Sequence, residues 1–159
     1  MTSRRLDESL RAYRMGDPAG EHPVYSGAGS RRYPGRWNER GQALIYASEH
    51  YSTALLETLA RTGELPRNQH YVGIEIPAGV TYEVVTKDNL PGWCDVDGAA
   101  ARAFGSAWYR ERRSAILIVP SVVARVERNV LIHPHHDDAG SIRVGLETPV
   151  YWDSRLFAR

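Results

Sequence analysis

A short loop, a strand end and the helix that follows them carry the residues with the clearest chemical potential. Arg36 lies in a stretch rich in glycine and proline, Tyr46 ends an apolar strand, and Glu57 lies in the next expected helix. A guanidinium suits bidentate binding of a pyrophosphate, and a tyrosine offers a ring for stacking and a hydroxyl for hydrogen bonding. A carboxylate stabilises the positive charge that develops on a sugar ring when its glycosidic bond breaks. This combination favours an enzyme that handles an anionic, ring-bearing ligand such as a dinucleotide.

Each of these residues also has a purely structural interpretation. Arg36 is compatible with an exposed surface arginine, and Tyr46 with an ordinary core tyrosine. Glu57 is spaced to pair with Arg61 one helical turn later, and Arg14 with a charged partner at the edge of its strand. The residue types alone leave both interpretations open.

Three other segments are less informative. Ser121 follows an apolar run and a proline, but no G-x-S-x-G motif surrounds it, so hydrogen bonding is favoured over acyl transfer. The run His133–Asp138 contains imidazoles and carboxylates that could bind zinc or iron, yet neighbouring loop residues rarely converge on one ion. Residues 27–29 lack the spacing of a phosphate-binding loop. We therefore expect no metal, and the role of the loop 133–136 stays open.

Composition excludes several classes of protein. The 159 residues are 42% hydrophobic and 25% charged, which is typical of a globular protein of one domain. The formal charge of +1 gives no global reason to expect nucleic-acid or membrane-surface binding. The single cysteine, Cys94, excludes an internal disulfide, and no apolar segment suggests a signal peptide or membrane span. The expected location is the cytoplasm.

Hydrophobic patterns predict a mixture of strands and helices. Strands are expected over residues 11–15, 43–47, 72–76, 115–119, 129–132 and 142–146. One helix is expected to end at Gly63, and another to cover 96–108 after a start at Asp95 or Asp97. Residues 16–41 are expected to be a long loop, and such loops in compact domains are usually functional or disordered.

The order of these motifs resembles the RES domain, a family named for an arginine, a glutamate and a serine and found as the toxin of bacterial toxin–antitoxin pairs. The matching segments are G-S-R-R-Y-P-G-R-W-N at 29–38, I-Y-A-S at 45–48, A-L-L-E at 54–57, S-A-I-L-I-V-P-S at 114–121 and R-N at 128–129. The similarity extends from about Tyr13 to Phe157. One departure is His133, where the family often has asparagine.

The resemblance implies an α+β fold like that of ADP-ribosyltransferases, with a mixed β-sheet core and flanking helices around an NAD cleft. Residues 1–159 would form a single RES domain. Family members consume NAD⁺, as substrate and without a metal, at the bond between nicotinamide and ribose. The ADP-ribose would pass to a host protein, to water or to phosphate.

The resemblance also implies roles for particular residues. The implied catalytic residues are Glu57, Ser121 and Tyr46, and the implied NAD-binding residues are Arg14, Arg36, Asn38 and Tyr46. The two arginines would anchor the phosphates, and the tyrosine would stack near nicotinamide. The glutamate would orient the ribose and stabilise the developing positive charge. The serine would position that glutamate or the ribose, and Ser121 is preferred over Ser114.

A partner and two alternatives complete the expectations. The family implies a cognate antitoxin with a helix-turn-helix domain that covers the active site, whereas this chain shows no element for reading DNA. A ribonuclease toxin using Arg36, Glu57 and a histidine such as His133 is the first alternative, although the near-neutral charge disfavours it. The second is a nucleotide-binding module without catalytic activity.

Overall fold

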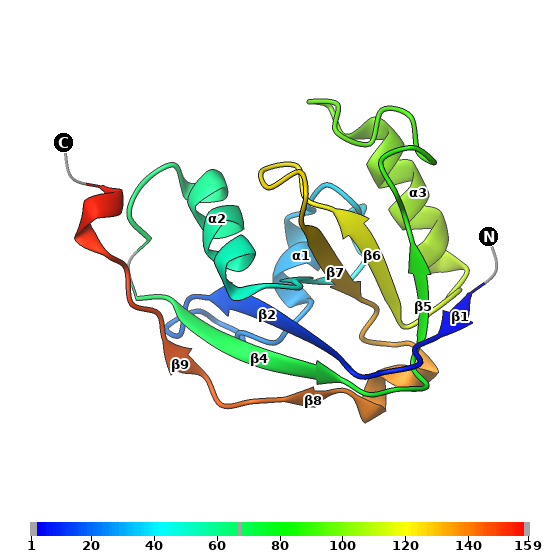
Figure 1. Ribbon diagram of the computed structural model, residues 1–159, viewed down its shortest axis with the longest axis horizontal. Helices are drawn as coiled ribbons and strands as arrows, with labels where there is room; N and C mark the ends of the chain where they lie inside the picture. The colour runs from blue at the N-terminus through cyan, green and yellow to red at the C-terminus, as the bar shows by residue number, and fades with distance from the viewer. Residues whose placement is uncertain (1–2, 67, 158–159) are drawn as a thin grey trace.

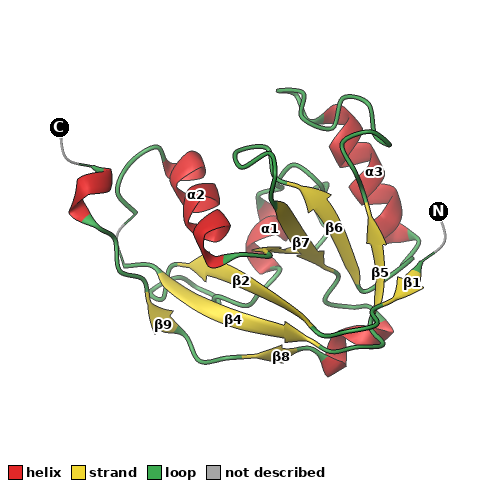
Figure 2. Cartoon of the chain, viewed as in Figure 1, coloured by secondary structure: helices red, strands yellow, loops and turns green. Residues whose placement is uncertain are grey.

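The computed structural model describes residues 3–66 and 68–157. Within these residues nine strands form one curled, mixed β-sheet, and three α-helices lie against it (Figures 1 and 2). The strands are β1 (Arg4–Arg5), β2 (Leu10–Gly16), β3 (Ile45–Ser48), β4 (His70–Ile76), β5 (Thr81–Val84), β6 (Ile116–Pro120), β7 (Arg128–Ile132), β8 (Arg143–Val144) and β9 (Thr148–Pro149). The helices are α1 (Ala28–Arg32), α2 (Tyr51–Thr62) and α3 (Ala99–Arg110), with the 3-10 helices η1 (Asp137–Ser141) and η2 (Ser154–Leu156).

The sheet is forked near its middle. Its strand order is β1, β5, β6, β7, β3, β2, β4 and β8, and β9 also pairs with β4. Among the described strands, β5 and β6 run parallel and the other pairs are antiparallel. Strands β2 and β3 share a single residue pair, Tyr13 with Ser48, whereas β2 and β4 share seven. The two halves of the sheet therefore separate between β2 and β3, and α2 contacts both of these strands (Figure 1).

Two apolar clusters pack on opposite faces of β6, an inner strand of the sheet. Ile116 belongs to one cluster and Leu117 to the other. Successive side chains of a strand point to opposite faces, so a strand that is buried on both faces requires an unbroken apolar run. Helix α3 covers the second cluster through Ala101 and Trp108, which are both fully buried.

Close packing of α3 fixes the loop that precedes β3. A Cβ atom built on Gly105 would lie only 1.9 Å from the carbonyl oxygen of Trp37, so this contact requires glycine. Trp37 itself is buried in the second cluster. The residue before it, Arg36, is thereby held at a defined place between α3 and the fork of the sheet.

The α+β class predicted from the sequence is confirmed. The strands predicted over 11–15, 72–76, 115–119 and 129–132 correspond to β2, β4, β6 and β7, and the helix ending at Gly63 is α2. The apolar run 43–47 becomes a strand only from Ile45, and the alternating segment 142–146 shortens to β8. Within the described residues no helix is long and apolar enough to cross a membrane.

Several elements differ from the expectation. Helix α1 lies in the segment expected to be a loop, and the strands β1, β5 and β9 were not expected. The helix expected from Asp95 or Asp97 begins only at Ala99, because Gly98 adopts a left-handed conformation (φ 65°) at its N-cap. Val96, which the helical pattern included, therefore lies outside α3 and is fully exposed.

Candidate active site

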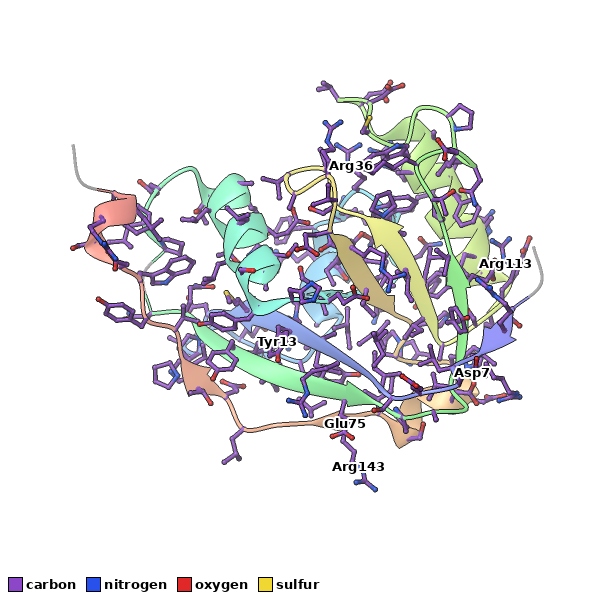
Figure 3. The ribbon with its side chains drawn as sticks, viewed as in Figure 1. Asp7, Tyr13, Arg36, Glu75, Arg113 and Arg143 are labelled. Atoms are coloured by element: carbon purple, nitrogen blue, oxygen red, sulfur yellow. The ribbon has the colours of Figure 1, made fainter. Side chains whose placement is uncertain are left out.

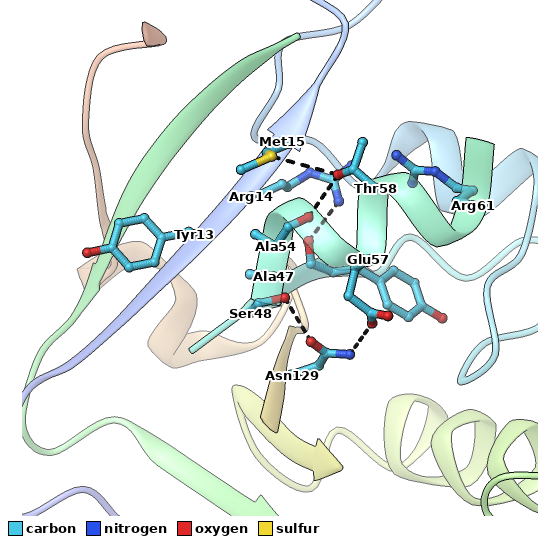
Figure 4. Close-up of a pocket in the computed structure, with 11 residues that line it drawn as sticks. Tyr13, Arg14, Met15, Ala47, Ser48, Ala54, Glu57, Thr58, Arg61 and Asn129 are labelled. Carbon is cyan, nitrogen blue, oxygen red and sulfur yellow. Dashed lines mark hydrogen bonds between the residues drawn. The ribbon is translucent and has the colours of Figure 1, made fainter. Parts of the chain in front are cut away.

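A cleft of about 590 Å³ opens beside the fork of the sheet. Its walls come from α1 and the loop that follows it, from β3, from the inner face of α2 and from the segment at the end of β6. This volume lies within the roughly 300–1,000 Å³ usual for ligand sites. A smaller cavity of about 70 Å³ shares several wall residues with it under α2 (Figure 4). Of the residues predicted from the sequence, the structure brings together Arg14, Arg36, Tyr46 and Glu57 at the cleft, but not Asn38 or Ser121.

Glu57 is held by a chain of hydrogen bonds that starts in the sheet. Asn129 on β7 donates from Nδ2 to Oε2 of Glu57, and Ser48 on β3 donates from Oγ to Oδ1 of Asn129 at 2.8 Å (Figure 4). The register between β3 and β7 pairs Ser48 directly with Asn129. The position of the carboxylate is therefore set by strand pairing as well as by α2.

The electrostatic environment of Glu57 has two opposing parts. Burial raises the pKa of Glu57 above its usual range, while the hydrogen bond from Asn129 and the charges of Arg61 and Arg36 act to lower it. A carboxylate in a partly dehydrated cleft interacts more strongly with a nearby positive charge than one in water does. Glu57 is thus suited to stabilising a cation that forms in the cleft.

Arg36 reaches from its loop toward the segment that leads into α3 (Figure 3). Its Nη1 donates to the carbonyl oxygens of Asp95 at 2.6 Å and Trp93 at 3.3 Å. Its Nε and Nη2 donate no hydrogen bond to any described residue, and the side chain lines the cleft. Arg36 is therefore anchored at one nitrogen and has two others with which to bind an anion.

Tyr46 and Asn38 hold the loop that carries Arg36 in place through hydrogen bonds. The hydroxyl of Tyr46 donates to Oδ1 of Asn38 at 2.6 Å and accepts from the backbone nitrogen of Trp37 at 3.0 Å. A Cβ built on Gly35 would lie 2.7 Å from Cζ of Tyr46, so the ring fits only against glycine. Burial is the main cause that raises the pKa of Tyr46. The hydroxyl is engaged within the protein, and the ring forms part of the cleft wall.

Asn38 lies behind the cleft wall. Its side chain is fully buried, Oδ1 accepts from Gly35 N at 2.8 Å as well as from Tyr46, and Nδ2 donates to Ser30 O at 2.9 Å and Gln42 O at 3.0 Å. Both polar atoms of this side chain are hydrogen-bonded within the protein, to the loop itself, to Ser30 of α1 and to Tyr46 of β3. The geometry assigns Asn38 to holding the loop.

Arg14 is largely engaged by backbone carbonyls. It donates from Nε to Val24 O at 2.6 Å, from Nη1 to Tyr46 O at 2.8 Å and from Nη2 to Ser26 O at 3.5 Å. Burial, with a smaller effect of the neighbouring charge of Arg61, lowers the pKa of Arg14 to about 10. The side chain ties β2 to the loop around residue 24 and contributes its charge to the cleft.

Neither candidate serine forms a hydrogen bond with Glu57. Ser121 is fully buried, and its Oγ accepts from the backbone nitrogen of Ala124 at 3.0 Å, which closes the turn after β6. Ser114 is also fully buried, and its hydroxyl accepts from Trp108 Nε1 at 2.8 Å and donates to Ile116 O at 2.8 Å. The turn that Ser121 closes carries Val122 and Val123 into the cleft wall, whereas Ser114 lies in the core beside α3.

The loop 133–136 is separate from the cleft. His133 is buried and stacks on Tyr109 with ring centroids 4.0 Å apart, and its Nε2 lies 3.0 Å from Tyr109 O. Burial lowers the pKa of His133 to about 4, so the ring is neutral at physiological pH. No group of three or more His, Cys, Asp or Glu side chains in the described part of the chain is arranged to hold a metal ion. His133 does not line the cleft, which weighs against the proposed ribonuclease triad.

No ligand-binding or catalytic role was predicted from the sequence for two polar residues of the cleft, Asn129 and Arg61. Asn129 was noted only as part of a matching segment, because its link to Glu57 depends on the β3–β7 register. Arg61 was interpreted as an ion-pair partner of Glu57, yet the two side chains form no ion pair within 4.0 Å, and Arg61 lines both cavities. The position of Arg61 one helical turn after Glu57 was the feature of the sequence that could have indicated a place in the cleft.

Comparison with known protein families agrees with this architecture. The model of the RES domain matches residues 11–153, which is most of the chain. The protein therefore belongs to the RES domain family. A protein of Sphingobium sp. (strain YBL2) named Prs ADP-ribosylating toxin is 41% identical over 140 residues, covering 84% of this chain and 87% of that protein.

A further relative and a solved structure extend the comparison. A Photorhabdus laumondii protein named Toxin Res is 32% identical over 119 residues, covering 72% of this chain and 76% of that protein. A chain in the crystal structure of the Mycobacterium tuberculosis MbcT–MbcA toxin–antitoxin complex superimposes with a TM-score of 0.75 at 16% identity. The match covers 92% of this chain and 86% of that chain, so the two share a fold.

Proposed function

We propose that the protein is the toxin of a bacterial toxin–antitoxin pair and that it cleaves NAD⁺ at the bond between nicotinamide and ribose. The observation that carries this proposal is a half-buried carboxylate, Glu57, held by Asn129 in a cleft of about 590 Å³ that arginines line. The names of the relatives from Sphingobium and Photorhabdus support a toxin, the word ADP-ribosylating in the first name supports a reaction that consumes NAD⁺, and the toxin–antitoxin complex of the structural neighbour supports an antitoxin partner.

The proposed reaction uses the positive charge of the bound substrate. The bond between C1′ of the ribose and the pyridinium nitrogen breaks, and nicotinamide leaves as a neutral molecule with the bonding electrons. The ribose becomes oxocarbenium-like, and the carboxylate of Glu57 stabilises this cation. An acceptor oxygen or nitrogen then bonds to C1′ and loses its proton, which yields the ADP-ribosylated product.

The other residues position the substrate in this scheme. Arg36 binds the pyrophosphate through its unengaged nitrogens, and the ring of Tyr46 contacts the nicotinamide end. Arg14 adds positive charge from the wall, and Asn38 keeps the loop of Arg36 in place. Ser121 acts through the turn that it closes, because it has no contact with the cleft.

The acceptor is proposed to be a side chain of a host protein, as the name of the Sphingobium relative suggests. The test uses NAD⁺ labelled in its adenylate half, incubated with the purified protein and host lysate, with and without phosphate. Label on a lysate protein supports transfer and identifies the target. Label in free ADP-ribose or its phosphorylated product, with nicotinamide released, would replace the transferase with an NAD⁺-degrading enzyme, and intact NAD⁺ would reject both.

The proposed partner is a cognate antitoxin that has a helix-turn-helix domain. The antitoxin would cover the cleft, and the proposed location of the complex is the cytoplasm. The structural relative was crystallised in a toxin–antitoxin complex. Tyr33 and Val123 line the cleft and are 70% and 42% exposed, so a covering protein would bury apolar surface at this mouth. Co-expression should yield a stable complex in which NAD⁺ turnover is suppressed. A complex with undiminished turnover would contradict this mode of binding.

Arg36→Ala is expected to weaken substrate binding more than it slows the reaction. Loss of a charge-assisted contact to pyrophosphate should raise the KM for NAD⁺ by about ten- to a hundredfold. Steady-state kinetics would measure the change, with Arg40→Ala as the control, since Arg40 is an exposed arginine that does not line the cleft. An unchanged KM would remove Arg36 from the phosphate-binding role.

Asn129→Ala is expected to lower kcat and to move the acid limb of the pH profile. The hydrogen bond from Asn129 lowers the pKa of Glu57, so its loss should raise that pKa further. If Glu57 acts as a carboxylate, activity falls as the pH drops through this pKa, and the acid limb therefore shifts to higher pH. We expect kcat to fall by about ten- to a hundredfold at its optimum, the effect of losing a hydrogen bond to a charged group.

Ser48→Ala is expected to have the same effect as Asn129→Ala on the pH profile, but a smaller one. It removes the hydrogen bond that orients Asn129 but leaves the contact to Glu57 available. The pH profile should shift in the same direction by a smaller amount. An Asn129→Ala variant with an unshifted acid limb would show that this amide does not tune Glu57.

A further inference from the structure

Arg61 lies in the last turn of α2 and lines the cleft, and none of the described residues hydrogen-bonds or ion-pairs with its side chain. It is four residues after Glu57 and lines both the cleft and the smaller cavity (Figure 4). Side chains of opposite charge at this helical spacing are close enough to form a weakly stabilising ion pair. Here the nitrogens of Arg61 form no hydrogen bond or ion pair with any residue that the structure describes. All five N–H groups of its guanidinium are thus available to a ligand.

The charges of the cleft are unbalanced. Its titratable lining includes three arginines, Arg14, Arg36 and Arg61, against the single carboxylate of Glu57, which leaves two positive charges in excess. Arg61 also lies close enough to Arg14 for its positive charge to contribute to the lowered pKa of Arg14. Like charges gathered in one cleft focus the field on an anion there. An excess of two matches the two negative charges of a pyrophosphate diester.

The three arginines differ in how many hydrogen bonds they can still donate. Arg14 already donates from all three of its nitrogens to the backbone carbonyls of residues 24, 26 and 46. Arg36 uses one nitrogen for residues 93 and 95. Arg61 uses none for any described residue. Because planar, bidentate binding of phosphate requires two free parallel N–H groups, Arg61 and Arg36 meet this requirement better than Arg14.

We propose that Arg61, together with Arg36, binds the anionic diphosphate of the substrate, while Arg14 contributes charge from the wall and holds the backbone. This assignment rests on the proposed function, because it takes a dinucleotide as the ligand. It differs from the expectation drawn from the sequence, in which Arg14 was the second phosphate anchor. Arg61 is then a determinant of specificity for diphosphate-containing ligands.

The test compares a charged ligand with a neutral one. Titration calorimetry would measure the binding of ADP and of adenosine to the wild type, Arg61→Gln, Arg61→Lys and Arg110→Gln. Arg110 is the matched control, because it is likewise the basic residue in the last turn of a 12-residue helix but does not line the cleft. Arg61→Gln should weaken ADP binding by about ten- to a hundredfold and leave adenosine binding unchanged.

The control variants define what would overturn the assignment. Arg61→Lys should recover part of the ADP affinity, and Arg110→Gln should bind both ligands as the wild type does. Wild-type ADP affinity in Arg61→Gln, or an equal loss for ADP and adenosine, would contradict a role in binding the diphosphate. A wild type that binds no ADP would contradict it as well.

Nicotinamide release, measured in parallel, separates this inference from the proposed function. If the wild type binds ADP through Arg61 but releases no nicotinamide from NAD⁺, the proposed diphosphate site stands and the proposed NAD⁺-cleaving activity is refuted. The opposite result is also informative. If the wild type releases nicotinamide and the Arg61→Gln variant binds ADP with unchanged affinity, the proposed activity stands and the proposed role of Arg61 is refuted.

Discussion

Glu57→Gln is expected to lower the turnover of NAD⁺ by at least about a hundredfold, equivalent to about 2.7 kcal/mol of transition-state stabilisation, while NAD⁺ binding stays largely intact. Glutamine keeps the shape of the side chain, and its amide oxygen still accepts the hydrogen bond from Asn129. It lacks the negative charge that the oxocarbenium-like state requires. The loss should therefore appear in kcat and leave the KM nearly unchanged.

The control for this variant is Glu75→Gln. Glu75 is an exposed glutamate on β4 that does not line the cleft, and Figure 3 shows it beside Arg143 of β8. Its replacement should leave kcat and KM unchanged. A Glu57→Gln variant with wild-type turnover would remove Glu57 from the reaction.

Gly105→Ala is expected to destabilise the fold and to weaken the site at the same time. Alanine usually stabilises a helix relative to glycine by up to about 1 kcal/mol. At residue 105, however, the added Cβ would lie 1.9 Å from the carbonyl oxygen of Trp37, so α3 or the loop must move. We expect a loss of roughly 1–3 kcal/mol in the free energy of unfolding, as for overpacked cores. Because Trp37 follows Arg36, the KM for NAD⁺ should rise in the molecules that stay folded.

Urea unfolding would measure the first effect and steady-state kinetics the second. Gly140→Ala is the control, because a Cβ at residue 140 would meet no atom within 4 Å. Its unfolding midpoint and KM should match those of the wild type. A Gly105→Ala variant that unfolds at the wild-type midpoint would show that the contact between α3 and the loop is not obligatory.

The sequence predicts elements well where burial imposes a long, regular pattern. The run 115–119 becomes β6, whose residues are all buried, and the periodic segment before Gly63 becomes α2. Elements whose residues are mostly polar are harder to predict. Helix α1 has five residues and buries none of them, so it carries no apolar periodicity.

Strand β5 illustrates a different difficulty. It has only four residues, and its buried position is a glutamate, Glu83, which is 1% exposed and pairs with Arg113 at 3.0 Å. A charged residue within a short segment normally indicates a surface position. The pairing partner lies 30 residues away and cannot be identified from the local pattern.

The same distinction applies to the site. Arg36, Tyr46 and Glu57 could be selected because a loop, a strand end and a helix follow one another within a short stretch of sequence, and all three line the cleft. The hydrogen bond from Asn129 to Glu57 joins residues 72 positions apart and depends on the pairing of β3 with β7. Which nitrogens of an arginine are already engaged is a property of the packed structure, and it is what distinguishes Arg61 from Arg14.

The central claim, that the cleft around Glu57 cleaves NAD⁺, is tested most directly by nicotinamide release. Purified wild-type protein and the Glu57→Gln variant would be incubated with NAD⁺, and free nicotinamide would be quantified over time, after circular dichroism has confirmed that both are folded. We predict steady release by the wild type and at least about a hundredfold slower release by the variant. Equal release by both proteins, or none by the folded wild type in the presence of host lysate, would contradict the claim.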